Sequence, residues 1–176
     1  MGGGGYILYL GPYENFAENF FNKTKRNVIV NYAGSRKERI LKEEEITNIL
    51  LMLANNFEKE QFYVSSTPER FNETKKIIER LKKDNIKNLP KTKNIFEIAS
   101  FVKYASVIIS VDTSIIHIAS AYNKPIIGFY TSNKENQKSA GPRGRNCYII
   151  ESDSNEKIEN LNLNEIKEKM ELILKI

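Results

Sequence analysis

The sequence predicts one α/β domain, in which a parallel β-sheet carries helices on both faces. Short runs of β-branched and aromatic residues alternate along the 176 residues with longer stretches of helical period, the pattern of parallel strands joined by helices. Several runs are apolar at every position, which indicates strands covered on both faces. The opening Met1–Gly5 is interpreted as a flexible tail or a cloning remnant. Residues 6–176 are expected to form the single domain, because their length suits one core.

The strands are expected where the β-branched and aromatic runs occur. Six segments have this character: Tyr6–Leu10, Val28–Tyr32, Gln61–Ser65, Val107–Val111, Ile126–Tyr130 and Cys147–Ile150. Cys147 is the only cysteine, and it is interpreted as a buried strand residue. A lone cysteine cannot form an intramolecular disulfide, which fits a cytoplasmic protein.

Helices are expected between these strands, where apolar residues recur at three- and four-residue spacing. The predicted helices are Glu43–Phe57, Asn72–Lys83, Ile95–Tyr104, Ser114–Tyr122 and Glu165–Lys175. The acidic run at positions 43–45 suits the positive end of a helix dipole. Asn94 is expected to cap the third helix, since asparagine side chains accept hydrogen bonds from the first turn.

The bulk composition narrows the possible partners without selecting one. The net charge is +5 and the pI is about 9.1, which is compatible with nucleic acid, anionic lipid or a phosphorylated ligand. Lysines and arginines are interspersed with acids and no nucleic-acid motif occurs, so nucleic acid is not expected as a partner. No run reaches the roughly 20 apolar residues of a membrane span. With one histidine, His117, and no cysteine near it in sequence, no metal or other cofactor is expected.

The most informative segment runs from Val107 to Tyr130. An apolar strand ends at Asp112-Thr113-Ser114, and a helix is expected to begin at once. Ligands of open parallel sheets bind beyond the carboxyl ends of the strands, where helix starts present unpaired N–H groups. Thr113 and Ser114 are therefore candidates for contacting a diphosphate, with simple helix capping as the alternative. Asp112 either accepts a hydrogen bond from a ribose or sugar hydroxyl or caps the helix.

Four segments in the same order resemble the lipopolysaccharide heptosyltransferase family. The residues from Asp112 to His117 resemble its Asp-Thr-(Gly or Ser)-x-x-His motif. The residues from Asn31 to Arg39 are similar to the loop after the first strand of its donor domain, with Arg39 in the basic position. Ser66 to Glu69 resembles the following turn, and Gly141 with its proline resembles a late Gly-Pro loop.

The resemblance implies a fold, a reaction and a site. The fold would be Rossmann-like and equivalent to the C-terminal half of a two-domain GT-B glycosyltransferase. The enzyme would transfer a heptose or related sugar from a nucleoside diphosphate, with ADP expected, to a lipopolysaccharide or lipooligosaccharide core acceptor. The implied nucleotide-sugar-binding residues are Ser35, Arg39, Glu69, Asp112, Thr113, Ser114, His117 and Gly141. No residue is expected to be the catalytic base, because the family's base lies in an N-terminal acceptor domain that 176 residues are too few to include. The chain alone is therefore expected to be inactive.

Other interpretations of these residues remain open. Arg36 and Lys37 are either on the rim of the site or solvated surface charges, His117 is either a ligand contact or a packed residue, and Glu69 either binds the nucleoside or forms a surface ion pair. The basic loop at 131–146 either closes over phosphate, meets anionic lipid at the inner face of the cytoplasmic membrane, or is a mobile surface loop. The whole domain could also be a non-enzymatic nucleotide or sugar-phosphate binding module.

Overall fold

Six parallel strands form one sheet in the computed structural model, which describes residues 10, 11, 13–135, 137 and 146–176. The strands stand in the order β3-β2-β1-β4-β5-β6, and every described pair runs parallel. Their bounds are β1 Asn27–Asn31, β2 Gln61–Ser65, β3 Ile86–Asn88, β4 Val107–Val111, β5 Ile126–Tyr130 and β6 Cys147–Glu151. The predicted α/β fold with a parallel sheet is therefore confirmed.

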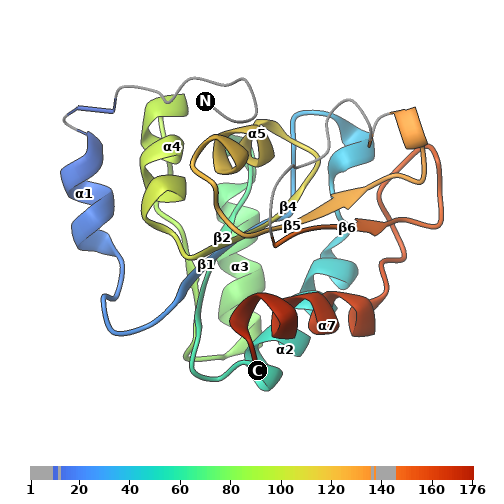
Figure 1. Ribbon diagram of the computed structural model, residues 1–176, viewed down its shortest axis with the longest axis horizontal. Helices are drawn as coiled ribbons and strands as arrows, with labels where there is room; N and C mark the ends of the chain where they lie inside the picture. The colour runs from blue at the N-terminus through green and yellow to red at the C-terminus, as the bar shows by residue number, and fades with distance from the viewer. Residues whose placement is uncertain (1–9, 12, 136, 138–145) are drawn as a thin grey trace.

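The helices divide into two layers that cover opposite faces of the sheet (Figure 1). Helices α1, α4 and α5 pack on one face around Ile29 and Ile108, and α2, α3 and α7 pack on the other around Val30 and Ile109. The α-helices are α1 Tyr13–Phe20, α2 Glu43–Asn56, α3 Phe71–Leu81, α4 Ile95–Tyr104, α5 Ser114–Ala121 and α7 Leu163–Leu174, and the short 3-10 turns are η2 Lys37–Arg39 and η3 Pro68–Arg70. Among these, no helix has the length and apolar content to cross a bilayer.

The predicted helices agree with the structure to within a few residues, and one predicted cap is confirmed in detail. Asn94 Oδ1 accepts a hydrogen bond from the N–H of Glu97 at 3.0 Å, and the Glu97 carboxylate in turn accepts the N–H of Lys93 at 2.6 Å. These two bonds resemble a capping box, except that Glu97 accepts from the residue before the cap, and they satisfy two backbone donors near the helix start. They fix where α4 begins, beside the carboxyl end of the sheet.

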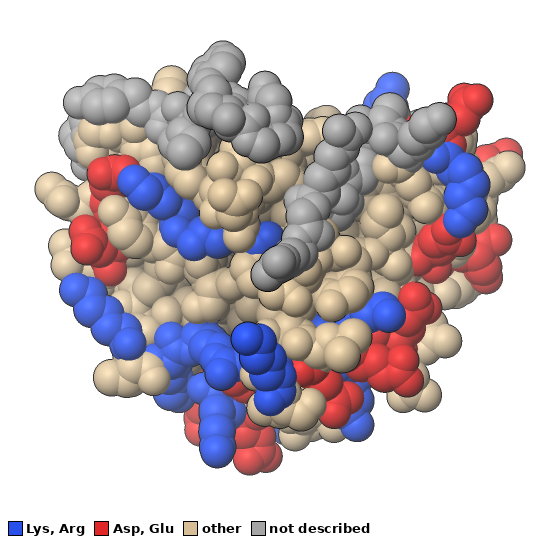
Figure 2. Space-filling view, in the orientation of Figure 1, with Lys and Arg blue, Asp and Glu red and all other residues tan. Residues whose placement is uncertain are grey.

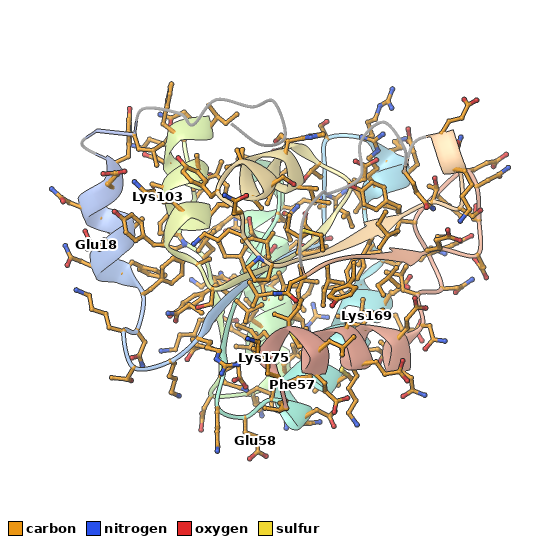
Figure 3. All side chains as sticks on the ribbon, viewed as in Figure 1. Glu18, Phe57, Glu58, Lys103, Lys169 and Lys175 are labelled. Carbon is orange, nitrogen blue, oxygen red and sulfur yellow. The ribbon has the colours of Figure 1, made fainter. Side chains whose placement is uncertain are left out.

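Two elements were not predicted, and one prediction lies mostly outside the described residues. Strand β3 has three residues, of which only Ile86 is buried, so it carries no alternating pattern. Helix α1 packs its aromatic side chains on α4, and Lys103 of α4, labelled in Figure 3, forms an ion pair with Glu14 of α1. The predicted strand Tyr6–Leu10 lies outside the described residues except for Leu10, which is buried.

The edge strand β6 corrects one expectation about burial. Cys147 lies in β6 as predicted but is only partly buried, because an edge strand has a neighbour on one side only. Nearby, Lys169 of α7 extends over the Tyr148 ring at 5.2 Å (Figure 3), a cation–π contact that covers this strand. Burial raises the pKa of the Cys147 thiol, which disfavours the reactive thiolate.

The strand order places a binding crevice between β1 and β4. From β1 the chain proceeds outward through β2 to β3, and from β4 it proceeds in the opposite direction to β6. Helix α2 after β1 and helix α5 after β4 lie on opposite faces, so their connections diverge at this point. Such a switch point opens a crevice at the carboxyl ends of the strands, where α/β domains bind ligands.

Candidate functional site

An open pocket of about 450 Å³ lies at this switch point. Its walls are the loop after β1, the loop after β2, the start of α4 and the start of α5. The pocket is therefore built from four loops held by one rigid sheet, an arrangement typical of ligand sites. The predicted site residues Ser35, Arg39, Asp112, Thr113 and Ser114 all line it.

The loop after β1 is a tight turn that directs Arg39 back to the sheet. The Gly34 N–H donates to Arg39 O at 3.0 Å, and the Arg39 N–H donates to Arg36 O at 3.0 Å. Ala33 and Ile40 form an antiparallel bridge, which closes the turn. Arg36 and Arg39 both line the pocket, whereas Lys37 of the same turn does not. The structure thus brings Arg39 to the site as expected, brings Arg36 there as well, and leaves Lys37 at the surface.

Arg39 is held against Asp112 across the switch point. Arg39 Nη2 lies 3.3 Å from Asp112 Oδ2, and Nη1 donates to the Asp112 backbone oxygen at 3.3 Å. The Arg39 side chain is 26% exposed and that of Asp112 is 7% exposed. The pair therefore places one positive group, still open to the pocket, next to the end of β4.

Burial gives the Asp112 carboxylate an energetic cost. It raises the pKa of Asp112, while the charges of Arg39, His117 and Arg36 oppose that rise without cancelling it. A carboxyl group whose pKa is higher in the folded than in the unfolded state binds protons more tightly when folded. The ionised Asp112 carboxylate therefore lowers the free energy of unfolding at neutral pH. This destabilisation disappears as the pH falls through the pKa of the folded state and then that of the unfolded state. A costly carboxylate at a pocket wall is typical of a functional site.

Thr113, and not Asp112, caps helix α5. Thr113 Oγ1 accepts a hydrogen bond from the N–H of Ile115 at 3.3 Å, and its backbone is extended, as a cap requires. The interpretation of Asp112 as the helix cap is thus wrong, because its carboxylate instead pairs with Arg39. The start of α5 faces the pocket through Thr113, Ser114 and Ile115. The positive end of the helix dipole at this start suits an anion.

Gly34 is required by a close approach between the two sides of the pocket. A Cβ atom added at Gly34 would lie 2.8 Å from Thr113 Cγ2, closer than two carbon atoms can pack. The loop after β1 therefore rests directly on the residue that caps α5. Any side chain at position 34 would push these two walls apart.

We expect Gly34→Ala to destabilise the domain by about 1–3 kcal/mol, the usual cost of overpacking, because the added methyl group displaces the capping Thr113. Thermal unfolding measures the loss. The double variant Gly34→Ala with Thr113→Ser removes the opposing methyl group and keeps the hydroxyl, so it should recover most of the stability. If the double variant is no more stable than Gly34→Ala, the close approach to Thr113 is not the cause.

Three predicted residues lie outside the pocket lining or outside the described chain. His117 is exposed on α5, so its interpretation as a packed residue is wrong; it lies near enough to Asp112 to lower the pKa of that carboxyl. Glu69 is exposed on η3, while its neighbours Thr67 and Pro68 line the pocket. Gly141 and most of the basic loop at 131–146 lie outside the described residues.

One wall of the pocket was missed in the sequence. It consists of the segment that follows β3 and begins α4, with Thr92, Lys93, Asn94, Ile95 and Ile98 at its surface. The cap at Asn94 was the available signal, since it marks a helix start. Because β3 was not recognised, nothing placed that helix start at the same edge as Thr113. In the described chain, no three His, Cys, Asp or Glu side chains are grouped to hold a metal ion.

A parallel sheet of this order, with an open pocket at its switch point and a capped helix start in the pocket wall, defines a Rossmann-like α/β domain. Residues 12–170 match the family model described as glycosyltransferase family 9 (heptosyltransferase). The chain therefore belongs to this family.

Known proteins similar to the chain are longer than it is. It is 33% identical over 121 residues to an Escherichia coli (strain K12) protein named "Putative lipopolysaccharide heptosyltransferase 4", and the match covers 69% of this chain and 31% of that protein. The fold resembles the structure of E. coli heptosyltransferase WaaC with ADP, with a TM-score of 0.72 and 20% identity over 92% of this chain and 48% of that one. It also resembles E. coli ADP-heptose lps heptosyltransferase II, with a TM-score of 0.75 and 12% identity over 96% of this chain and 53% of that one. The chain thus spans about a third to a half of the length of these relatives.

Proposed function

We propose that this domain binds the nucleoside-diphosphate sugar donor of a glycosyltransferase that transfers heptose or a related sugar. The observation that carries the proposal is the meeting of Arg39 with the start of α5 in one pocket at the switch point. The names of the similar structures, which include ADP and ADP-heptose, support the same donor. The acceptor would be a lipopolysaccharide core oligosaccharide, which would bring the domain to the inner face of the cytoplasmic membrane.

The chemistry assigns the diphosphate to the Arg39 side of the pocket. In sugar transfer the bond from the sugar to the diphosphate breaks, and negative charge develops on the departing diphosphate oxygen. Arg39 and the N–H groups around Ser114 would stabilise that charge, because they are fixed before the reaction begins. Thr113 and Ser35 would add hydroxyl donors at the same rim. Transfer with inversion also needs a carboxylate that deprotonates the acceptor hydroxyl, and we assign that role to no residue of this chain.

The remaining wall suits the nucleoside. Ile95, Ile98, Ile115 and Pro68 give the pocket apolar surface beside polar backbone, and a planar base packs favourably on such a surface. We assign Glu69 and His117 to the outer rim, where the sugar would pass. Figure 2 shows that lysine and arginine side chains also gather low on the drawn face, so net positive charge is not confined to the pocket.

ADP-linked sugars should stabilise this domain against heat more than UDP- or GDP-linked sugars do, because the proposal assigns adenine to the apolar wall. A thermal-shift screen of the three donor classes at equal concentrations measures the preference. AMP serves as the control for the diphosphate, since it lacks the second phosphate and should bind less well than ADP. Equal shifts for all three nucleotides, or no shift for any, would remove the donor assignment.

A further inference from the structure

The floor of the pocket is polar at a depth where the sheet is otherwise apolar. Ser65, Asn31 and Ser110 are register partners across β2, β1 and β4, and they are 9%, 1% and 0% exposed. Asn31 and Ser65 line the pocket. Burying such groups is costly unless each finds a hydrogen-bond partner. The hydrogen bonds of the central Asn31 therefore decide whether these three side chains can bind a ligand.

The hydrogen bonds of Ser110 fix the orientation of the Asn31 amide. The Ser110 hydroxyl has one hydrogen, which it donates to the backbone oxygen of Val111 at 2.8 Å. In its longer contact with Thr113 Oγ1, at 3.4 Å, Thr113 is then the donor. Ser110 Oγ can therefore only accept from Asn31, and Asn31 Nδ2 donates to it at 3.1 Å. The amide nitrogen must face β4, and the amide oxygen Oδ1 must face away from it.

That amide oxygen has no hydrogen-bond partner among the described residues. Elsewhere among the described residues, three side-chain atoms are fully buried and lack a hydrogen-bond partner: Asn27 Oδ1, Gln61 Nε2 and Asn88 Oδ1. Asn31 is 1% exposed, and its side-chain hydrogen bond within the described residues uses the amide nitrogen and not the oxygen. Because Ser110 holds the amide nitrogen, the acceptor oxygen is the polar group of this side chain that remains for a ligand in the pocket that Asn31 lines.

We infer that Asn31 Oδ1 is a specificity-determining group that accepts a hydrogen bond from the nucleoside of the bound ligand. The inference rests on the proposed function, because it takes the ligand to be a nucleoside diphosphate. Phosphate oxygens only accept hydrogen bonds at neutral pH, so they cannot pair with this oxygen. The diphosphate belongs to the start of α5, and the group that reaches the floor is then a neutral donor of the adjoining nucleoside: a ribose hydroxyl or the base amine.

Ligand analogues test this inference on the unaltered protein by calorimetry. ADP is compared with 2′-deoxy-ADP, with 3′-deoxy-ADP, and with inosine diphosphate, in which an oxygen replaces the amine. One of the three should bind about five- to tenfold more weakly than ADP, the effect of one net hydrogen bond, and its identity tells ribose from base. If ADP binds and all three analogues match it, the inference is wrong while the proposed function stands. If ADP itself does not bind, the proposed function fails and the inference with it.

The variant Asn31→Ala then shows whether Asn31, and not another residue, binds the ligand group that the weaker analogue lacks. Removing the amide should weaken ADP binding by the same factor, and the discriminating analogue should bind the variant as well as ADP does. If the analogue remains weaker than ADP in the variant, another residue reads that group and the inference falls. Ser110→Ala replaces Asn31→Ala if the latter does not fold. It frees the amide to turn, so it should reduce the same discrimination, and unchanged discrimination would contradict the argument from orientation.

Discussion

Replacing Arg39 with alanine should weaken ADP binding by about 1.5–3 kcal/mol, which corresponds to a roughly 10- to 150-fold higher Kd. Arg39 is a charged donor that is partly shielded from water, and charge-assisted hydrogen bonds in such places are stronger than neutral ones. Calorimetric titration of the wild-type and variant proteins with ADP measures the difference. Circular dichroism checks that the fold is intact, because the substitution also leaves Asp112 without its ion-pair partner.

Lys37→Ala is the matched control for Arg39→Ala. Lys37 lies in the same 3-10 turn and carries the same charge, but it is exposed and does not line the pocket. Its removal should change ADP binding by no more than about 0.5 kcal/mol, as for most exposed side chains. A folded Arg39→Ala protein that binds ADP as tightly as Lys37→Ala would show that Arg39 is a solvated surface charge.

These 176 residues alone should bind donor and transfer no sugar. The proposal assigns donor binding, and no other step, to the residues of this chain, and a separate acceptor domain would need on the order of 100 residues for its own core. Transfer requires donor and acceptor to be held together near a base, and this positioning is worth roughly 7–11 kcal/mol. Without an acceptor held beside the donor, transfer should fall below detection, although slow hydrolysis of the donor by water can remain.

Mass spectrometry of the acceptor measures this outcome. The purified chain is incubated with ADP-heptose and a truncated lipid-linked core, while donor binding is verified by calorimetry on the same sample. The donor should be bound and the acceptor should keep its mass. An acceptor that gains one heptose in good yield would show that this chain carries its own base and acceptor site.

The strongly patterned elements of the fold could be predicted from the sequence, and the short ones could not. Strands β4 and β5 are almost wholly apolar, and in α2 an apolar residue recurs at every turn. These patterns predict the elements without knowledge of what packs against them. Strand β3 exists because Phe62 and Val64 of β2 offer it a parallel edge, not because Ile86-Lys87-Asn88 favours a strand. Helix α1 likewise depends on the face of α4 on which it packs.

Within the site, the sequence indicated residue types but not their neighbours. The motif at Asp112 placed a helix start at a strand end, and this was correct. The pairing of Arg39 with Asp112 depends on β1 lying beside β4, which is a property of strand order and leaves no local pattern. The cap at Thr113 was equally undecidable, because aspartate and threonine are both good caps and the backbone conformation selects between them. The same order of strands brought Asn31 beside Ser110.

The measurement that tests the central claim most directly is a titration of the isotopically labelled chain with ADP, followed through its two-dimensional amide NMR spectrum. The account predicts that the amide signals of Gly34, Ser35, Ser114 and Ile115 shift together and saturate with one Kd, because these N–H groups surround the proposed diphosphate position. The open groove between α2 and α3, lined by Thr47 and Leu51 among others, should show no shift. Saturable shifts confined to that groove, or an unchanged spectrum at high ADP concentration, would contradict the account.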